Sequence, residues 1–282
     1  MDARTNLDRH LRGSRRLDLT GVEWDAIPLH PLTAAEARCL AYMMDIETHT
    51  VIFLRDLLAT RVADEPEITA FLACWVYEEL WHGEALSRFL GEAGIPLAPD
   101  RELPGHDDPY PSRVARNAGI RLAGRLRGRL TRAGLVATSL LSKTFPATHM
   151  TWGALNELST LTGYQRMVDT TAHPVLADLL SRIIRDERRH YSYYRLEAER
   201  RLGESSSARR VTRLALDRVW AMVGSGVRPQ EETDFVMVHL FGDSDGLETA
   251  HRLDAMVDTL PGLDGLRLFE TARQEAVDRV AA

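Results

Sequence analysis

The sequence predicts an all-α fold, a four-helix bundle of two helical hairpins with a long crossover between them and additional C-terminal helices. Three observations support this fold class. Apolar residues recur at helical spacing over four long stretches. Short polar turns join these stretches in two pairs. The sequence has no sustained alternation of β-branched residues, and no Asn-Gly or Asp-Gly turn joins two such runs.

The composition is that of a globular chain. Its 282 residues are 44% apolar and 27% charged, with a formal net charge of −6, which excludes wholesale disorder and a membrane composition. We expect neither a signal peptide nor a membrane span, because no apolar stretch is long enough. The two cysteines, Cys39 and Cys74, cannot make a disulfide framework, so we predict a cytoplasmic protein in which both are small buried side chains.

We treat residues 1–282 as a single domain of five consecutive segments. The segments are an N-terminal extension (1–32), a first hairpin (33–94), a basic crossover (95–144), a second hairpin (145–203) and a C-terminal helical segment (204–282).

The first hairpin has clear start and stop signals. Thr33 and Glu36 form a capping box at the start of its first helix, which we expect to run to about Thr60. The second helix starts at Pro66, a favoured first-turn residue, and stops at Gly94, a residue suited to the position after a helix. The turn between them is short, so the two helices should pack antiparallel.

The second hairpin repeats this arrangement. Its first helix is predicted from about Pro146 to Thr171, and its second from Pro174 to Gly203. The C-terminal segment continues as shorter helices that glycines and a Pro-Gly pair interrupt.

Two Glu-x-x-His motifs lie on the second helices of the hairpins, one on each. They are Glu79 with His82 and Glu187 with His190. On a helix, residues i and i+3 share a face, so the carboxylate and the imidazole point the same way. The motif alone is a weak signal, because a third copy, Glu248–His251, lies outside both hairpins. We expect that copy to be an ordinary surface pair.

Each motif has a partner glutamate on the first helix of its hairpin. Glu47 precedes Glu79 by 32 residues, and Glu157 precedes Glu187 by 30 residues. The midpoints of both intervals fall in the predicted turns, and residues equidistant from the turn of an antiparallel hairpin lie side by side. Both sets lie about 24 Å from their turns at 1.5 Å per residue, so we expect them to meet at one level of the bundle.

Four carboxylates and two imidazoles in an apolar core require counter-charge, because an unpaired buried carboxylate costs several kcal/mol. Two divalent cations would supply it. This ligand set is that of di-iron and di-manganese carboxylate bundles, whose layout with one long crossover is ferritin-like, and mixed oxygen and imidazole ligation suits iron or manganese. The predicted ligands of the two cations, iron with manganese as the alternative, are Glu47, Glu79, His82, Glu157, Glu187 and His190. We expect the neighbouring His49 and Glu84 to have solvated or core-edge roles.

The segments around these residues resemble those of soluble acyl-carrier-protein desaturases. Residues 78–83, Glu-Glu-Leu-Trp-His-Gly, are similar to the Glu-Glu-x-x-His-Gly segment of that family, and Asp186–His190 to its Asp-Glu-x-Arg-His segment. Glu157, followed three residues later by Thr160, looks like the third ligand and a threonine near the dioxygen-binding face. The resemblance covers roughly residues 40–200 and is specific at the ligand helices.

The resemblance implies a ferritin-like homodimer. Its di-iron centre, reduced by a ferredoxin-type donor, uses dioxygen to remove two hydrogens from a carrier-bound acyl chain. The resemblance also implies that Glu79 and Glu187 bridge the irons and that Thr160 lies on the oxygen side of the centre. Asp186 would hydrogen-bond a ligand histidine or take part in electron delivery. Trp24 either completes that relay or is a packing aromatic.

Other functions stay open, because the first-ligand segment, Asp45–Thr50, lacks the Glu-Glu-Ala-Leu-Pro sequence of the plant desaturases. One alternative is another di-iron oxygenase, a hydroxylase or N-oxygenase of small-molecule or carrier-bound precursors. A second is iron storage or peroxide detoxification, for which the long crossover and tail are superfluous. A third is a metal-free helical scaffold that binds a protein partner.

The predicted crossover is strongly basic. Residues 109–156 contain no acidic side chain, and eight basic residues lie from Arg113 to Lys143. An acidic acyl carrier protein could dock on this segment by electrostatic steering; the alternative is a solvated basic face. The absence of interleaved aromatic residues over 112–133 argues against single-stranded nucleic acid, so we expect no nucleic-acid partner.

Overall fold

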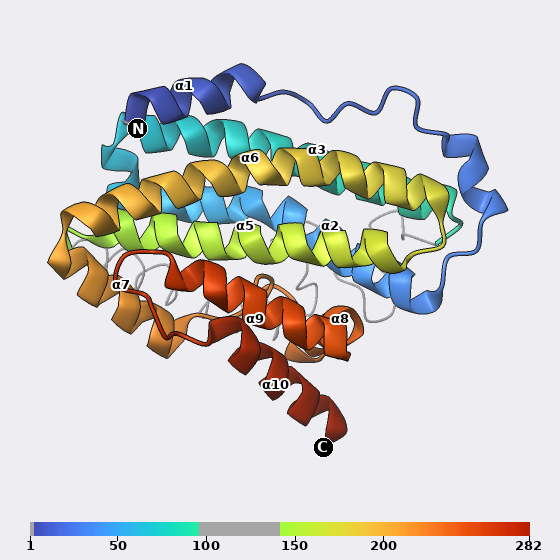
Figure 1. Cartoon of the computed structure of the whole chain (residues 1–282). Helices are drawn as coiled ribbons and strands as arrows, with labels where there is room; N and C mark the ends of the chain where they lie inside the picture. Colours follow the sequence, from blue (N-terminus) through green and yellow to red (C-terminus); the bar gives the residue numbers. More distant parts are fainter. Residues whose placement is uncertain (1–2, 96–141) are drawn as a thin grey trace, which may run out of the picture.

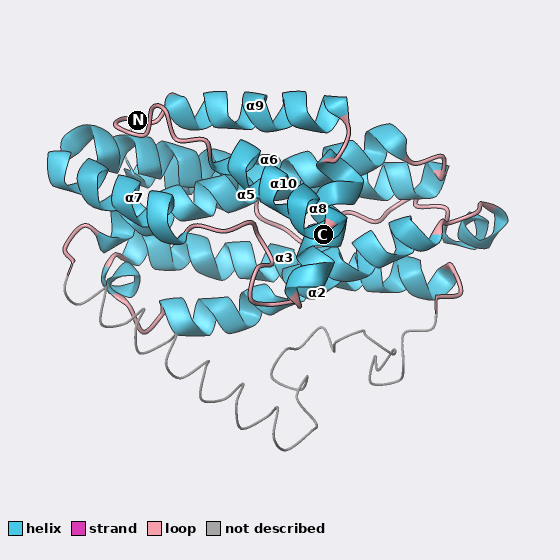
Figure 2. Cartoon of the chain, turned by 90° about the horizontal axis from the view of Figure 1, so that it is seen from below, coloured by secondary structure: helices cyan, strands magenta, loops and turns pink. Residues whose placement is uncertain are grey.

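The computed structural model describes residues 3–95 and 142–282, and this part of the chain contains helices and loops but no strand (Figure 2). The predicted all-α class is therefore confirmed. The predicted basic segment Arg113–Lys143 lies outside the described residues except at its last two positions. Among the described helices, none combines the length and the apolarity that crossing a membrane requires.

Four long helices form two antiparallel hairpins (Figure 1). They are α2 (Ala34–Leu57), α3 (Pro66–Glu92), α5 (Phe145–Thr170) and α6 (Pro174–Glu204). Both turns lie where the sequence places them, and three of the four helices end within two residues of the predicted position.

The first hairpin shows why its ends are well defined. The Thr33 hydroxyl accepts a hydrogen bond from the Glu36 backbone N–H, and the Glu36 carboxylate accepts one from the Thr33 backbone N–H. α2 ends three residues before the predicted Thr60, because the Thr60 hydroxyl caps a separate 3₁₀ turn, η2 (Arg61–Asp64). Gly94, just after α3, has φ of +74°, the left-handed conformation that glycine adopts at low cost.

The hairpins pack against each other through apolar side chains from all four long helices. Leu40, Leu86, Tyr164 and Leu180 represent α2, α3, α5 and α6 in one buried cluster, which lies toward the turn of the second hairpin. A second buried cluster toward the turn of the first hairpin includes Phe71 from α3 and several residues of the other helices. The bundle therefore has two apolar regions along its length.

The N-terminal extension contains a helix that the sequence analysis did not predict. α1 (Ala3–Gly13) packs against both α3 and α6 and buries Leu7 and His10. A segment without regular structure, residues 14–23, then leads to a 3₁₀ helix, η1 (Trp24–Leu29). Figure 1 shows α1 and this segment running along one side of the long helices.

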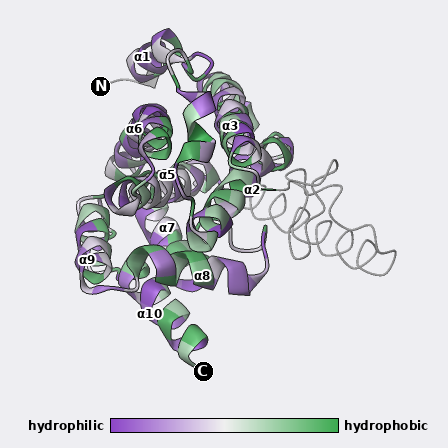
Figure 3. Cartoon of the chain, turned by 90° about the vertical axis from the view of Figure 1, so that its right-hand side faces the viewer, coloured by the Kyte–Doolittle hydropathy of each residue, from purple (hydrophilic) through white to green (hydrophobic). Residues whose placement is uncertain are grey.

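The C-terminal segment forms shorter helices, as predicted, and the structure has four of them. They are α7 (Ser206–Val219), α8 (Gln230–Phe241), α9 (Ser244–Asp258) and α10 (Leu268–Ala281). α8 packs against α2 and α5, and α7 and α9 pack against α5. Figures 1 and 3 both show α8 and α1 on opposite sides of the long helices, so the bundle is covered from two directions.

Gly153 allows α5 and α6 to approach closely near the site. A Cβ atom at this position would lie 2.2 Å from the ring of Tyr194. We expect Gly153→Val to lower the free energy of unfolding by about 1–3 kcal/mol, because the ring has to shift in a packed core. Gly91→Ala is the matched control, since nothing lies within 4 Å of its Cβ position. Urea unfolding of both variants tests this, and equal stability would contradict it.

Candidate metal centre

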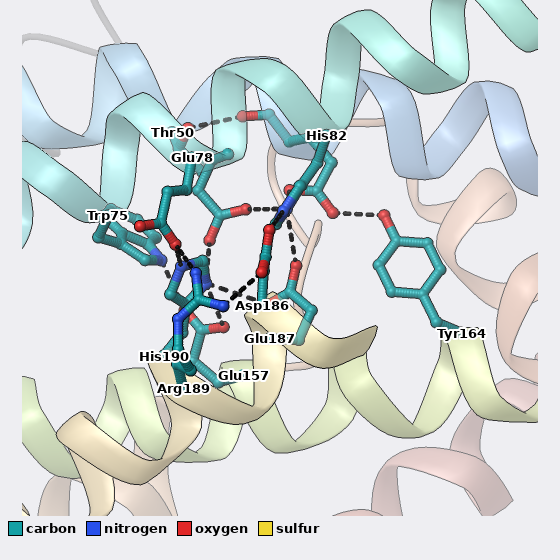
Figure 4. Close-up of polar contacts among 12 residues, drawn as sticks. Thr50, Trp75, Glu78, His82, Glu157, Tyr164, Asp186, Glu187, Arg189 and His190 are labelled. Carbon is teal, nitrogen blue, oxygen red and sulfur yellow. Dashed lines mark hydrogen bonds and ion pairs between the residues drawn. The ribbon is translucent and has the colours of Figure 1, made fainter. Parts of the chain in front are cut away.

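The structure brings all six predicted ligands together inside the bundle (Figure 4). They form two groups, and the potential ligand atoms of each group lie within 4.8 Å of one another. The first group is Glu47, Glu79, His82 and Glu187, and the second is Glu79, Glu157, Glu187 and His190. None of the six residues is more than 5% exposed. Two of them, Glu79 and Glu187, belong to both groups.

The six residues lie at the junction of the two apolar regions. On α2, for example, Ile46 packs on one cluster and Phe53 on the other, and Glu47 lies between them in sequence. The same order holds on α6, where Ile184 and Tyr191 flank the motif. Apolar packing on both sides thus holds the four helices in register and keeps this polar layer away from water.

The two shared carboxylates are placed symmetrically. Glu79 directs Oε2 to within 3.1 Å of His82 Nδ1 and Oε1 to within 3.1 Å of His190 Nδ1. Glu187 directs Oε1 to within 3.0 Å of His82 Nδ1 and Oε2 to within 3.4 Å of His190 Nδ1. Each carboxylate thus presents one oxygen to each half of the site, which is the arrangement of a bridging ligand.

A carboxylate from the opposite hairpin holds the outer nitrogen of each histidine. His82 Nε2 lies 3.4 Å from Asp186 Oδ2, and His190 Nε2 lies 2.8 Å from Glu78 Oε2. Because a carboxylate accepts the Nε2 proton, Nδ1 is the nitrogen that faces the shared oxygens and would be free to bind a metal once it loses its own proton. Asp186 thus contacts one of the predicted ligand histidines.

Glu78 is a site residue that the sequence analysis left without a role. It is the counterpart of Asp186, since each precedes a shared glutamate by one residue. Arg189 joins the two, donating to Glu78 Oε2 at 2.8 Å and to Asp186 Oδ1 at 2.5 Å. The repeated acid-Glu-x-x-His pattern was the signal that could have identified it.

Two aromatic donors fix the glutamates that are not shared. The Tyr164 hydroxyl donates to Glu47 Oε1, and Trp75 Nε1 donates to Glu157 Oε1 at 2.8 Å. The other oxygen of each carboxylate faces a histidine Nδ1, at 3.9 Å for Glu47 and 3.8 Å for Glu157. Neither donor was predicted, because both contacts join residues from different helices.

The electrostatics show that protons balance the charge of this cluster when metal is not bound. Burial, reinforced by the shared carboxylates, raises the pKa of Glu47 and of Glu157 well above the ordinary 4.5. Burial opposes charge on His82 and His190, but the surrounding carboxylates outweigh it and raise the pKa of both well above 6.5. Burial also opposes ionisation of Glu79, yet His190 and hydrogen bonds lower its pKa.

The donor set fits two divalent cations of the iron and manganese type. Carboxylate oxygens and imidazole nitrogens without thiolates suit these metals, and four carboxylates match the charge of two such ions. The histidines already expose Nδ1 inward, and the outer carboxylates and aromatic donors fix their orientation and that of the unshared glutamates. The residues present therefore fit a two-metal centre.

A small apolar cavity adjoins the centre on the side of Glu47. Its volume is about 60 Å³, and residues of α2, α5, α8 and the connection before α8 line it. Glu47, Tyr164 and the predicted Thr160 all contribute to its wall. Thr160 thus lies beside the cavity rather than among the six ligands, and Gly163 leaves room in the same wall.

The remaining sequence candidates lie outside the cluster. Within the described residues, His49 and Glu84 belong to neither ligand group. Trp24 packs beneath the guanidinium of Arg88, and no hydrogen bond joins it to any described site residue. In the third motif copy Glu248–His251, the glutamate pairs with Arg252 on the surface, as expected.

No protein-family model, curated protein or solved structure matches this chain. The interpretation of the site therefore depends on its geometry and on the chemistry of its side chains.

Bound metal should stabilise the protein more at about pH 8 than at about pH 6. Metal requires neutral imidazoles and ionised carboxylates, so protons compete with it. In the metal-free protein the raised pKa values of His82, His190, Glu47 and Glu157 stabilise the fold at low pH, and this stability is lost as pH rises through them. Glu79, with its lowered pKa, is ionised throughout this window.

Thermal unfolding with Mn²⁺ or with a chelator, at both pH values, measures this effect. The difference in Tm between the two samples should grow with pH. A difference that stays constant or shrinks would show that no protons are displaced.

Proposed function

We propose that this protein is a dioxygen-dependent oxidoreductase with a ferritin-like di-iron carboxylate centre, related in chemistry to the soluble acyl-carrier-protein desaturases. One observation is the main support for this proposal. The buried carboxylates of Glu79 and Glu187 each present one oxygen to His82 and the other to His190. A metal-free scaffold gains nothing from this costly arrangement, whereas two adjacent metal ions require it.

The features around the centre favour an oxygenase over iron storage. An apolar cavity reaches Glu47, and a substrate pocket explains its position. The two histidines are each held by a carboxylate that is itself tied to Arg189, which gives fixed rather than exchangeable ligands. A storage site, in contrast, has to release iron for transport.

When bound, two ferrous ions supply the electrons with which dioxygen is activated. The protein's own residues fix and isolate that chemistry. Glu79 and Glu187 would hold both ions, while Tyr164 and Trp75 orient the unshared carboxylates. The apolar regions on both sides exclude water from the cluster.

The substrate we propose first is a carrier-bound acyl chain, which would lose two hydrogens. The surface of the cavity is mostly apolar, with Met43, Met237 and Leu240 among its residues, and it would accept methylene groups beside the centre. The resemblance of the ligand segments to those of the desaturases supports the same chemistry. An acidic carrier on the basic crossover Arg113–Lys143, a ferredoxin-type donor and a homodimeric assembly belong to this proposal.

A second candidate is hydroxylation or N-oxygenation of a small molecule. The cavity volume of about 60 Å³ favours it, because pockets that enclose a ligand of drug size measure about 300–1,000 Å³. A long acyl chain would have to displace side chains of α8 to enter, whereas a small apolar group would fit directly.

The test begins with iron content and continues with product analysis. Protein loaded anaerobically with Fe²⁺ should hold about two irons per chain. It is then supplied with dioxygen, a reduced ferredoxin and acyl carrier proteins charged with chains of different length. Loss of two hydrogens supports desaturation, and gain of an oxygen atom supports the second candidate. Many irons per chain would indicate iron storage. Protein that binds no iron would refute the proposal.

A further inference from the structure

A larger cavity lies among the C-terminal helices, on the side of the bundle opposite α1 (Figures 1 and 3). Its volume is about 470 Å³, and residues of α7, α8, α10 and the connections 220–229 and 259–267 line it. We call it the outer cavity, and the small apolar cavity beside Glu47 the inner cavity. Pockets that enclose a small-molecule ligand measure about 300–1,000 Å³. The outer cavity is therefore large enough for a ligand.

The two cavities share a wall. Met222, Thr233 and Met237 line both of them. Thr233 is held in this wall, since its hydroxyl lies 3.1 Å from the Tyr42 hydroxyl, whereas the methionines have unbranched side chains that adapt to a neighbour. Movement of the two methionines would connect the outer cavity to the inner one, and so to Glu47.

Charged side chains of both signs line the outer cavity. Each acidic one has an arginine partner at 2.9 to 3.3 Å, and the pairs are Asp217–Arg218, Asp234–Arg279 and Glu275–Arg279. Arg267 pairs with Asp258, which lies outside the wall. The fourth arginine of the wall is Arg213. Asp258 is also near it, but no carboxylate of the described residues lies within ion-pair distance of Arg213. The wall therefore carries one unpaired positive charge.

Two backbone carbonyls fix the guanidinium of Arg213. Its Nη1 donates to the backbone oxygens of Gly262 at 3.2 Å and of Asp264 at 2.8 Å. Its Nε and Nη2 donate to none of the residues that the structure describes. These two nitrogens form an edge with which arginine binds a carboxylate through two parallel hydrogen bonds. Arg213 is thus a positioned cation whose carboxylate-binding edge is unused.

A second unused donor lies nearer the shared wall. Trp220 follows Arg213 by seven residues, which is two helical turns and about 10 Å along the axis of α7. Both residues line the outer cavity, and the Trp220 ring packs edge-on against Phe269, with 5.1 Å between the centroids. The Trp220 Nε1–H is buried and has no acceptor among the described residues, although a buried indole N–H usually has one. A ligand with an acceptor at this position would satisfy it.

We propose that the outer cavity binds a free organic acid, with its carboxylate on Arg213, and that the apolar end of this acid passes Met222 and Met237 into the inner cavity. The single unpaired cation matches a monoanion, and its unused edge matches the shape of a carboxylate. The Trp220 N–H donates to an acceptor, such as a carbonyl oxygen, between the two ends of the ligand.

This assignment rests on the proposed di-iron function and favours its second candidate substrate, a small molecule. An acyl chain on a carrier protein is held as a thioester and therefore has no carboxylate to place on Arg213. The order of the cavities also agrees with a molecule that is polar at one end and apolar at the other, because the outer cavity has the charged side chains and the inner cavity is mostly apolar.

Isothermal titration of metal-free protein with N-octanoylglycine tests both donors without turnover, since this probe has a carboxylate, an amide carbonyl and an apolar end. Arg213→Met should weaken its binding at least about tenfold. Trp220→Phe should weaken it about three- to tenfold but should not change the binding of octanoate, which lacks the amide carbonyl. Arg210→Met is the matched control, because Arg210 is exposed on α7 outside the wall, and it should match wild type.

A second variant guards against loss of the fold, since Arg213 also holds two carbonyls. Arg213→Lys keeps a charge and a donor for these carbonyls but not the paired edge. It should unfold thermally at the wild-type temperature and still bind N-octanoylglycine more weakly than wild type. Wild-type affinity in Arg213→Lys and in Arg213→Met would overturn the proposed carboxylate site.

Two further probes identify the group that Arg213 binds. The neutral amide of N-octanoylglycine should bind wild type as weakly as the acid binds Arg213→Met. S-octanoyl-4′-phosphopantetheine, the free form of a carrier's acyl arm, should bind no better than this amide. Tighter binding of the phosphopantetheine thioester than of the acid, lost in Arg213→Met, would overturn the assignment to a free acid and would favour the carrier-bound substrate.

Chain length tests the passage through the shared wall. From N-butanoylglycine to N-octanoylglycine, affinity for wild type should rise about two- to fourfold per methylene. Met222→Trp places a larger side chain in the wall, so it should bind N-butanoylglycine like wild type but lose the gain for the longer chains. The same gain in both proteins would show that the apolar end stays in the outer cavity, which contradicts the proposal.

Iron content separates this inference from the proposed function. Protein that holds about two irons per chain but binds N-octanoylglycine no better than its neutral amide would overturn the carboxylate site and leave the di-iron centre intact. Protein that binds the acid through Arg213 but takes up no iron would retain the carboxylate site and refute the proposed function.

Discussion

Glu187→Ala should remove both metal ions from the protein rather than one. Glu187 contributes a different oxygen to each ligand group, so its loss leaves both groups with three donors. Loss of a residue that merely orients a ligand costs about 10–100-fold in metal affinity, and we expect loss of this shared ligand to cost more than about 100-fold at both sites. Iron content by mass spectrometry, after reconstitution and desalting, measures the effect.

Two further variants make this result specific. Glu47 belongs to one group only, so Glu47→Ala should lower the iron content by about half. Glu248→Ala removes the glutamate of the exposed third motif, whose side chain is 71% accessible, and should leave the iron content unchanged. Full iron content in Glu187→Ala would mean that the ligand assignment is wrong.

The metal-free form of Glu187→Ala should be less stable than metal-free wild type. Burial and the charge of Glu79 oppose ionisation of Glu187, yet hydrogen bonds from His190 and His82 lower its pKa below 4.5, so its carboxylate offsets the charge of these two histidines, whose pKa values are raised. Removing this carboxylate leaves the buried histidine charge less well compensated. Thermal unfolding in the presence of chelator distinguishes loss of metal from loss of fold.

Arg228→Met should be the most destabilising substitution away from the centre. Arg228 Nη1 lies 2.7 Å from Asp45 Oδ2, and the two side chains are 4% and 2% exposed. Removing the guanidinium breaks this buried ion pair of Asp45, and breaking a buried pair by removing one partner costs about 3–5 kcal/mol. Asp45 precedes Glu47 on α2, and Arg228 follows the connection that lines the cavity, so the pair also holds the wall of the cavity in place.

The double variant Asp45→Asn/Arg228→Met provides the internal control. It removes both charges, and we expect it to recover most of the stability lost in the single variant. Arg252→Met breaks an exposed pair with Glu248, whose side chains are 61% and 71% accessible, and should cost less than about 1 kcal/mol. Equal denaturation midpoints for Arg228→Met and Arg252→Met would show that the buried pair contributes no more than the exposed one.

The structure could be predicted from the sequence where local signals determine the ends of helices. The capping box at Thr33, the prolines that start α3 and α6, and the glycine after α3 fix helix ends within a few residues. The site followed from these ends, because mirrored spacing about a turn brings Glu47 to Glu79 and Glu157 to Glu187.

What the sequence could not supply depends on contacts between distant segments. α1 was missed because its arginine-rich composition hides the few residues that it buries, such as Leu7 and His10. Tyr164 and Trp75 look like ordinary core aromatics until their hydrogen bonds to Glu47 and Glu157 are seen. The repeated acid-Glu-x-x-His pattern points to Glu78, but its contact with His190 appears only once the hairpins are packed, since His190 comes from the other hairpin.

The sharing of ligands between hairpins has a consequence for how the protein is made. Each ligand group takes three residues from one hairpin and one from the other. A ribosome releases the first hairpin well before the second, and domains begin to fold in that order. Neither group can be completed until Glu187 has been synthesised, even though Glu47, Glu79 and His82 are available much earlier. If the proposed function is correct, stable loading of both metals is therefore a late step of maturation, and iron starvation during synthesis should leave a folded chain that can be loaded afterwards.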